Sequence, residues 1–184
     1  MNKVEFLLIQ LEGMFYLECP DLYYNFLNDG IDNHRFSDNS LNMLYQWRNG
    51  MKIAQIEETG KYEFCGLGYF LPYAEARAFQ KQFIEDKCFD KDSYLPVIAS
   101  LGGDFLLVDT KKKSSKVYVY SPGLLIDHPM EAYASIESFV EAVYECFRQK
   151  AYRYDEDCYL QINDELEKEI TLKYNPMSAF WQGK

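Results

Sequence analysis

Two short apolar runs joined by a glycine-rich turn constrain the fold of this chain more than any other segment. Residues 96–99 and 105–108 are almost continuously apolar, and Gly102-Gly103-Asp104 lies between them. A strand with one solvated face alternates apolar and polar residues, so runs of this kind indicate central strands with both faces covered. The Gly-Gly-Asp connection allows a tight turn. We therefore expect two neighbouring central strands of a sheet.

Clear strand and helix patterns follow this pair along the chain. Residues 117–120 alternate valine and tyrosine, which is the period of a strand with one buried face. Further on, Ser135 is a good N-cap for a helix over residues 135–149 that carries one apolar face. That face is expected to consist of Ile136, Phe139, Val140, Val143 and Phe147. A packed helix should therefore follow the strands.

Helices are also expected on the N-terminal side of the strands. Pro20 resembles the first turn of a helix, which we expect to end at Gly30 as a left-handed cap. Ser40 is expected to cap a second helix, and residues 73–85 predict a third with one apolar face. Residues 4–17 are apolar with mixed spacing, which leaves helix and strand both open. The chain thus predicts helices towards both ends with strands between them.

Net charge and aromatic content narrow the classes of function. The 184 residues include 19 Lys and Arg against 29 Asp and Glu, a formal net charge of −10. A field of this sign repels phosphate backbones and anionic lipid heads, so general binding to nucleic acid or to a membrane surface is disfavoured. Tyrosine, with 16 residues, outnumbers glycine, with 10. An acidic, tyrosine-rich surface is the feature that we expect a partner to meet.

The cysteines and the apolar segments indicate a compartment. Five cysteines lie in separate segments without a CxxC pair: Cys19, Cys65, Cys88, Cys146 and Cys158. We therefore expect neither a zinc knuckle nor a disulfide framework. The apolar run at residues 6–9 is bracketed by glutamates and lacks a cleavage site, and no run of 18 apolar residues predicts a membrane span. A reducing, cytoplasmic location without a signal peptide is the resulting expectation.

Four segments, in this order, resemble the SUKH superfamily of Smi/Knr-type domains. They are residues 44–50 (LYQWRNG), 66–72 (GLGYFLP), 95–110 (LPVIASLGGDFLLVDT) and 134–147 (ASIESFVEAVYECF). The third is the most specific, because the family signature is a strand, a glycine turn and a second strand that ends in an aspartate. The residues that match the signature, which are expected to be structural, are Pro96, Gly102, Gly103, Asp104, Asp109, Ser135 and Phe139.

The resemblance implies an α+β domain with a mixed, mostly antiparallel sheet packed by N- and C-terminal helices. We expect a single domain over residues 1–184, with its core at about 38–150 and a C-terminal extension over 151–184. The extension and the basic loop at 111–116 depart from the family pattern. We expect the loop to be a solvated hairpin tip, and the extension to contain a strand and a possible helix.

The resemblance also implies a binding protein rather than an enzyme. Many SUKH members are immunity proteins, which neutralise a cognate polymorphic toxin, often a nuclease, by protein–protein interaction. The acidic charge suits this role, since a nuclease presents a basic groove to phosphate. The alternative, suggested by fungal relatives, is a regulatory adaptor that binds endogenous cell-envelope or signalling proteins. The identity of the neighbouring gene would separate the two.

Catalytic and metal chemistry have little support in the sequence. The histidines are His34 and His128, and a catalytic pair of Cys65 with His128 is less favoured than a buried structural cysteine. Asp109 is the other residue that a hydrolase would use. Residues 155–157, Asp-Glu-Asp, are the one dense carboxylate group, and a solvated turn is favoured there over a metal site. We therefore expect no cofactor and no metal.

Two features are candidates for partner binding. The first is a stripe of glutamates on the helix that Ser135 begins, for which an ordinary solvated face is the alternative. The second combines aromatic rings with carboxylates in the extension, as protein-binding hot spots do, and packing of the tyrosines against the domain is its alternative. The residues are Glu137, Glu141 and Glu145 for the first, and Tyr152, Tyr154, Asp155, Glu156 and Asp157 for the second.

Overall fold

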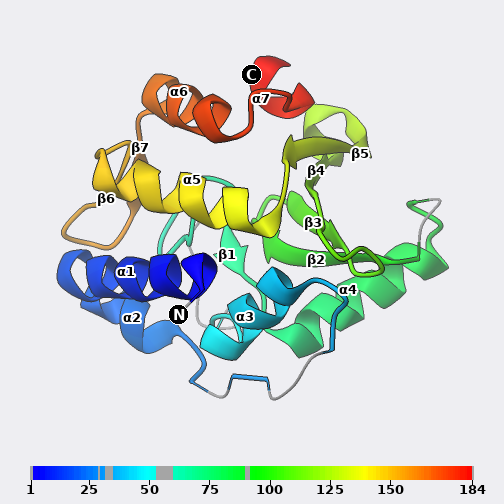
Figure 1. Cartoon of the computed structure of the whole chain (residues 1–184), viewed down its shortest axis with the longest axis horizontal. Helices are drawn as coiled ribbons and strands as arrows, with labels where there is room; N and C mark the ends of the chain where they lie inside the picture. The colour runs from blue at the N-terminus through cyan, green and yellow to red at the C-terminus, as the bar shows by residue number, and fades with distance from the viewer. Residues whose placement is uncertain (1, 29, 32–34, 53–59, 90–91, 184) are drawn as a thin grey trace.

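The computed structural model describes residues 2–28, 30–31, 35–52, 60–89 and 92–183 of the chain. The first half, blue to green in Figure 1, contains α1 (Lys3–Glu18), α2 (Pro20–Asn25), α3 (Asn39–Trp47), β1 (Tyr69–Phe70), α4 (Tyr73–Glu85) and β2 (Tyr94–Ala99). The second half contains β3 (Phe105–Asp109), β4 (Val117–Ser121), the 3-10 helix η2 (Pro122–Leu124), β5 (Ile126–Tyr133), α5 (Ile136–Arg148), β6 (Tyr152–Tyr154), β7 (Leu160–Ile162), α6 (Asp164–Tyr174) and α7 (Ala179–Gly183).

The sheet confirms the predicted α+β fold. Its strands lie in the order β1-β2-β3-β4-β5, and every neighbouring pair is antiparallel. The sheet was expected to be mixed, but the described strands form no parallel pair. All residues of β2 and β3 are buried, as their continuous apolar runs predict. In β4 the valines are buried and the tyrosines half-buried, which confirms the alternation.

The helices form a layer beside the sheet, with α5 at its centre. Figure 1 shows α5 running between α1 and α6, and α5 packs against both. The predicted apolar face of α5 is buried, and Ser135 caps the helix by accepting a hydrogen bond from the Ser138 backbone at 3.0 Å. On the other side of the fold, α4 packs against β2. The helix predicted over residues 73–85 is therefore confirmed.

The N-terminal helices differ from the prediction at their ends. Residues 4–17, which left helix and strand open, form α1. α2 ends at Asn25, well before Gly30, whose backbone does not have the left-handed conformation of a cap. α3 is capped by Asp38 and not by Ser40: the Asp38 carboxylate accepts from the Ser40 backbone at 2.7 Å. Aspartate and serine are equally good caps, so the sequence alone did not show that the helix is capped two residues earlier, at Asp38.

The glycines of the 66–72 segment allow neighbouring elements to approach closely. A Cβ on Gly66 would lie 2.7 Å from a carboxylate oxygen of Glu167 in α6 and 3.1 Å from the Tyr152 hydroxyl. Gly68 has a positive φ of 126° and lies directly against the Ala99 carbonyl of β2. Gly68 therefore excludes a side chain, whereas a side chain on Gly66 would displace the Glu167 carboxylate.

The C-terminal extension completes the core. It contains two strands, β6 and β7, which pair antiparallel, and two helices. Trp181 of α7 is fully buried, with its ring 6.1 Å from that of Tyr133. The buried apolar cluster accordingly runs from Val4 to Trp181. Within the described residues, every helix is too short or too polar to cross a membrane.

Candidate functional site

The three glutamates predicted to form an acidic binding stripe on α5 are engaged within the chain. Lys3 Nζ of α1 lies 2.7 Å from a carboxylate oxygen of Glu141 and 3.3 Å from one of Glu137. The mostly buried Glu145 accepts hydrogen bonds from Arg148 and Gln149 at 2.7–2.9 Å. The bond from Arg148 is the main reason that the pKa of Glu145 lies below its ordinary value. α5 therefore presents paired carboxylates and not an open acidic face.

The tyrosines predicted to anchor a partner pack against the core, Tyr152 as a buried residue and Tyr154 as a partly buried one. Tyr152 is 2% exposed and donates a hydrogen bond to the buried Glu167, while the Tyr154 hydroxyl donates to the Glu63 carbonyl. Both rings lie against Phe147, at centroid distances of 5.3 and 5.5 Å. Burial raises the pKa of both phenols well above the ordinary value. The surface hot spot predicted for these rings is corrected to core packing, because β6 folds back onto the end of α5.

The neighbouring carboxylates, Asp155, Glu156 and Asp157, lie in the exposed turn between β6 and β7. Asp155 organises this turn: one of its oxygens accepts from the backbones of Asp157 and Tyr159 at 3.1 and 2.9 Å, and the other from Gln161 at 2.9 Å. Across the described residues, no group of three His, Cys, Asp or Glu side chains is placed to hold a metal ion. The turn is thus built by its own hydrogen bonds.

The residues that match the SUKH signature have structural surroundings in the β2–β3 hairpin. Pro96, which lacks an N–H donor, sits where the β2–β3 register shifts. Gly103 has a positive φ of 88° in the turn after Gly102. Asp104 accepts a hydrogen bond from Ser100 at 2.9 Å and a second from Ser121 of β4. These contacts fix the central hairpin rather than open a site.

The remaining signature residues also support the framework. Asp109 is 4% exposed at the end of β3, and its carboxylate accepts from the Lys111 backbone at 3.1 Å. Lys111 itself pairs with Asp92 at 2.8 Å, at an exposed hairpin tip. Phe139 of α5 is fully buried, with its ring 5.0 Å from that of Tyr133, and Ser135 is the cap described above.

The residues considered for catalysis are poorly placed for it. Cys65 is 1% exposed, and burial raises the pKa of its thiol, which disfavours the reactive thiolate. His128 is an exposed residue of β5, where Asp127 lies 3.6 Å away. His34 lies outside the described residues. The arrangement therefore offers no activated nucleophile at Cys65.

The cysteines depart from expectation at one pair. Cys19, at the junction of α1 and α2, forms a disulfide with Cys158 in the β6–β7 turn. The two residues are 139 positions apart, so the sequence holds no local signal for the bond. The cysteine spacing, which indicated no disulfide framework, thus missed this single bond, which joins the extension to the N-terminal helices.

The sequence did not single out the outer face of α1 and α2, which the structure leaves exposed. Twelve large hydrophobic side chains are exposed in the described part of the chain, and five of them lie in these two helices. They are Phe6 (44% exposed), Ile9 (48%), Tyr16 (50%), Leu17 (79%) and Tyr24 (63%). Clustered exposed apolar side chains are typical of interaction sites. We call this set the outer face.

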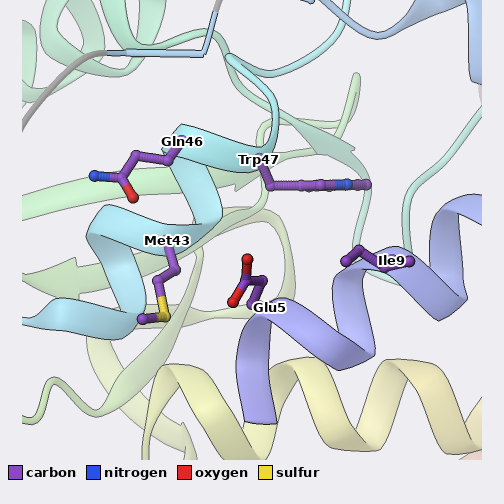
Figure 2. Close-up of a pocket in the computed structure, with 5 residues that line it drawn as sticks. All are labelled: Glu5, Ile9, Met43, Gln46 and Trp47. Atoms are coloured by element: carbon purple, nitrogen blue, oxygen red, sulfur yellow. The ribbon is translucent and has the colours of Figure 1, made fainter. Parts of the chain in front are cut away.

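Two hollows adjoin the outer face along α1. The first, of about 300 Å³, lies between α1 and α3, where Glu5 and Ile9 face Met43, Gln46 and Trp47 (Figure 2). The second, of about 540 Å³, lies over Gly13 and is lined by Ile9, Glu12, Tyr16 and Tyr23. Ile9 lines both hollows, so they adjoin along the helix, and we call the two together the groove.

A polar cluster fixes the wall of this groove. The Glu12 carboxylate accepts a hydrogen bond from the Trp47 indole at 2.7 Å and forms an ion pair with Arg48. The Arg48 guanidinium also lies 5.8 Å from the centre of the Tyr23 ring. The cluster joins α1, α2 and α3 and holds the Trp47 ring in place. Tryptophan, tyrosine and arginine are the residues that most often dominate protein-binding energy.

The spacing of apolar residues in the sequence would have revealed the outer face only if residues 4–17 had been assigned as a helix. On a helix, the exposed Phe6, Ile9 and Tyr16 fall opposite the buried Leu8 and Phe15. The apolar residues have mixed spacing because they occupy two sides of the helix, and for the same reason the helix could not be assigned from the sequence.

Comparison with known proteins finds no family model and no curated sequence that matches this chain.

Proposed function

We propose that this chain is a non-catalytic binding protein of the SUKH immunity type, which neutralises a cognate toxin by covering its functional surface. The observation that carries the proposal is the outer face, where apolar and aromatic side chains are exposed beside an aromatic and arginine cluster. Folding buries the other apolar side of α1, so this side is left for a partner.

Charge supports a protein partner with a basic surface. The net charge of −10 favours approach of a basic protein at long range, and a nuclease carries such a surface around its active site. Close to the outer face, Glu5 and Asp21 are exposed and form no ion pair with a described residue. These carboxylates would contact lysine or arginine at the rim, while the exposed rings and aliphatic chains form the centre.

The absence of an activated nucleophile at Cys65 supports a binding role over hydrolysis. The thiol is buried and its raised pKa keeps it protonated at neutral pH. Neutralisation by binding needs no catalytic group on this chain. The motif resemblance of residues 44–147 to SUKH domains supplies the class of partner.

The test uses the purified toxin domain encoded by the neighbouring gene. We expect this chain to bind it, measured by titration calorimetry, and to abolish its activity at equimolar concentration. Leu17→Asp should weaken binding at least about tenfold, because it places a charge on the outer face. The matched control is Leu124→Asp, at a leucine that is 69% exposed in η2 and away from α1; it should bind as the wild type does.

Two results would contradict the proposal. One is a neighbouring gene that encodes no toxin, or a toxin domain that neither binds nor loses activity. The other is a loss of binding with Leu124→Asp and not with Leu17→Asp, which would move the binding surface away from the outer face.

A further inference from the structure

The exposed residues of α1 have the spacing by which one helix packs against another. Phe6, Ile9, Gly13 and Tyr16 are separated by three, four and three positions. This alternation places all four along one line of a helix, which is the seam of a two-helix contact. The side chains of the buried face, such as Leu11 and Phe15, lie on the opposite side. We call these four residues the seam.

Gly13 lies at the middle of the seam without an internal reason for being glycine. A Cβ at this position would meet no atom within 4 Å, and the backbone has an ordinary helical conformation. Glycine inside a helix is unfavourable relative to alanine. Its advantage is that another backbone can approach closely, and Gly13 forms the floor of the larger hollow.

Charge around the seam selects the kind of helix that fits. The basic residues at its edges, Lys3 and Arg48, are already paired with Glu141 and Glu12. Glu5, next to Phe6 in α1, and Asp21, in the first turn of α2, have no cationic partner among the described residues. In Figure 2, Glu5 and Ile9 lie on the side of α1 that faces Trp47, at the mouth of the groove.

A second copy of this chain fits the seam poorly. Each copy would bring the same acidic residues and a net charge of −10 to the contact. Like charges facing one another across an interface oppose association. A helix with lysine or arginine beside its apolar seam instead pairs with Glu5 and Asp21.

We infer that the partner contributes an amphipathic helix, apolar at alternating three- and four-residue spacing and flanked by lysine or arginine, which packs across α1 at Gly13. The inference rests on the proposed function and adds the chemistry of the segment that is bound. It corresponds to recognition of a helix in a groove, with Ile9 and Tyr16 on either side of the crossing point.

The test uses three labelled helical peptides and the full chain, with binding followed by fluorescence anisotropy. The first peptide has leucines along one seam and lysines beside it, the second has glutamate for every lysine, and the third has the composition of the first with the leucines scattered. We expect the first to bind at least about tenfold more tightly than the others, and to weaken as salt is raised. Equal binding of the first and third peptides would overturn the inference, because charge alone would then explain it.

Substitutions at two glycines, one in the seam and one outside it as a control, test whether the peptide binds at Gly13. Gly13→Gln should weaken binding of the lysine peptide at least about tenfold, because the side chain fills the crossing point, and should raise thermal stability, because glutamine favours a helix. Gly123→Gln changes an equally open glycine in η2 and should alter neither binding of the lysine peptide nor neutralisation of the toxin. Unchanged binding by Gly13→Gln would overturn the inference, whereas unfolding is excluded by the thermal measurement.

The same variants separate this inference from the proposed function. Toxin neutralisation that survives Gly13→Gln contradicts the helix contact and leaves the proposed function standing. Seam-dependent binding of the lysine peptide, without inhibition of the neighbouring toxin, contradicts the proposed function and leaves the contact standing.

Discussion

α1 and α5 pack side by side, yet they differ in what the fold leaves exposed. α5 buries its apolar face, and the carboxylates of its other side are paired with Lys3 and Arg148. α1 buries one apolar face and leaves a second one in solvent. A helix that is apolar on two sides carries more apolar surface than the core of its own domain buries. The acidic helix is thus held by contacts within the fold, and the less regular one leaves exposed the surface that we propose for a partner.

The largest effect is expected from a pair of phenylalanines on the two sides of α1. Phe15 is fully buried against Phe26 and Phe147, so Phe15→Ala should lower the free energy of unfolding by about 3–5 kcal/mol. Phe6→Ala, at an exposed position of the same helix, should change it by less than about 0.5 kcal/mol. Urea unfolding followed by circular dichroism measures both. Equal losses of unfolding free energy in the two variants would show that both sides of α1 are packed in the fold.

The next effect concerns the bond between α1 and the extension. Reduction of Cys19–Cys158 with dithiothreitol should lower the free energy of unfolding by about 2–4 kcal/mol, because the bond closes a loop of 139 positions in the unfolded chain. Cys19→Ser with Cys158→Ser should show the same loss without reductant. Cys88→Ser, at a cysteine outside the disulfide, is the control. A wild type insensitive to reductant, with two titratable thiols at these positions, would contradict the bond.

A smaller loss is expected at Tyr152, for which the sequence left a partner-binding role and packing against the domain both open. Tyr152→Phe removes the hydroxyl that donates to the buried Glu167, and should destabilise the chain by about 1–3 kcal/mol. Tyr16→Phe, on the outer face, is the matched control and should leave stability unchanged. Thermal unfolding distinguishes the two, and a neutral Tyr152→Phe would mean that this ring is not part of the core.

The smallest effect is a pH dependence at Glu145. Its pKa is lowered in the folded chain by Arg148, so its ion pair stabilises the fold at neutral pH and is lost as pH falls below the unfolded value of 4.5. Glu145→Gln should cost about 1 kcal/mol or less at neutral pH. The difference between the wild type and this variant should then shrink on acidification. A difference that stays constant with pH would contradict the pairing.

The sequence predicted local features better than the placement of side chains that depend on distant contacts. Continuous apolar runs identified β2 and β3, and a single apolar face identified α5, because each signal is contained in its own segment. The burial of Tyr152 depends on Glu167 and Phe147, and the disulfide joins Cys19 to a residue 139 positions away. Neither is encoded in a local period.

The pairing of the glutamates and the packing of the tyrosines could not be predicted for a related reason. Net charge and tyrosine content are properties of the whole chain, and they do not tell which carboxylates are paired or which rings are buried. Glu137 and Glu141 are balanced by Lys3, which is distant in the sequence. The α1 part of the outer face, by contrast, follows from α1 alone once its helical conformation is known.

Hydrogen exchange, measured with and without the proposed partner, the toxin domain of the neighbouring gene, tests most directly which surface binds it. The two candidates are α1 with α2, and α5 with the extension. We expect the amides of residues 3–25, in α1 and α2, to gain protection on binding, and those of residues 152–162 to stay unchanged. Protection confined to α5 and the β6–β7 turn, with α1 and α2 unaffected, would contradict the account.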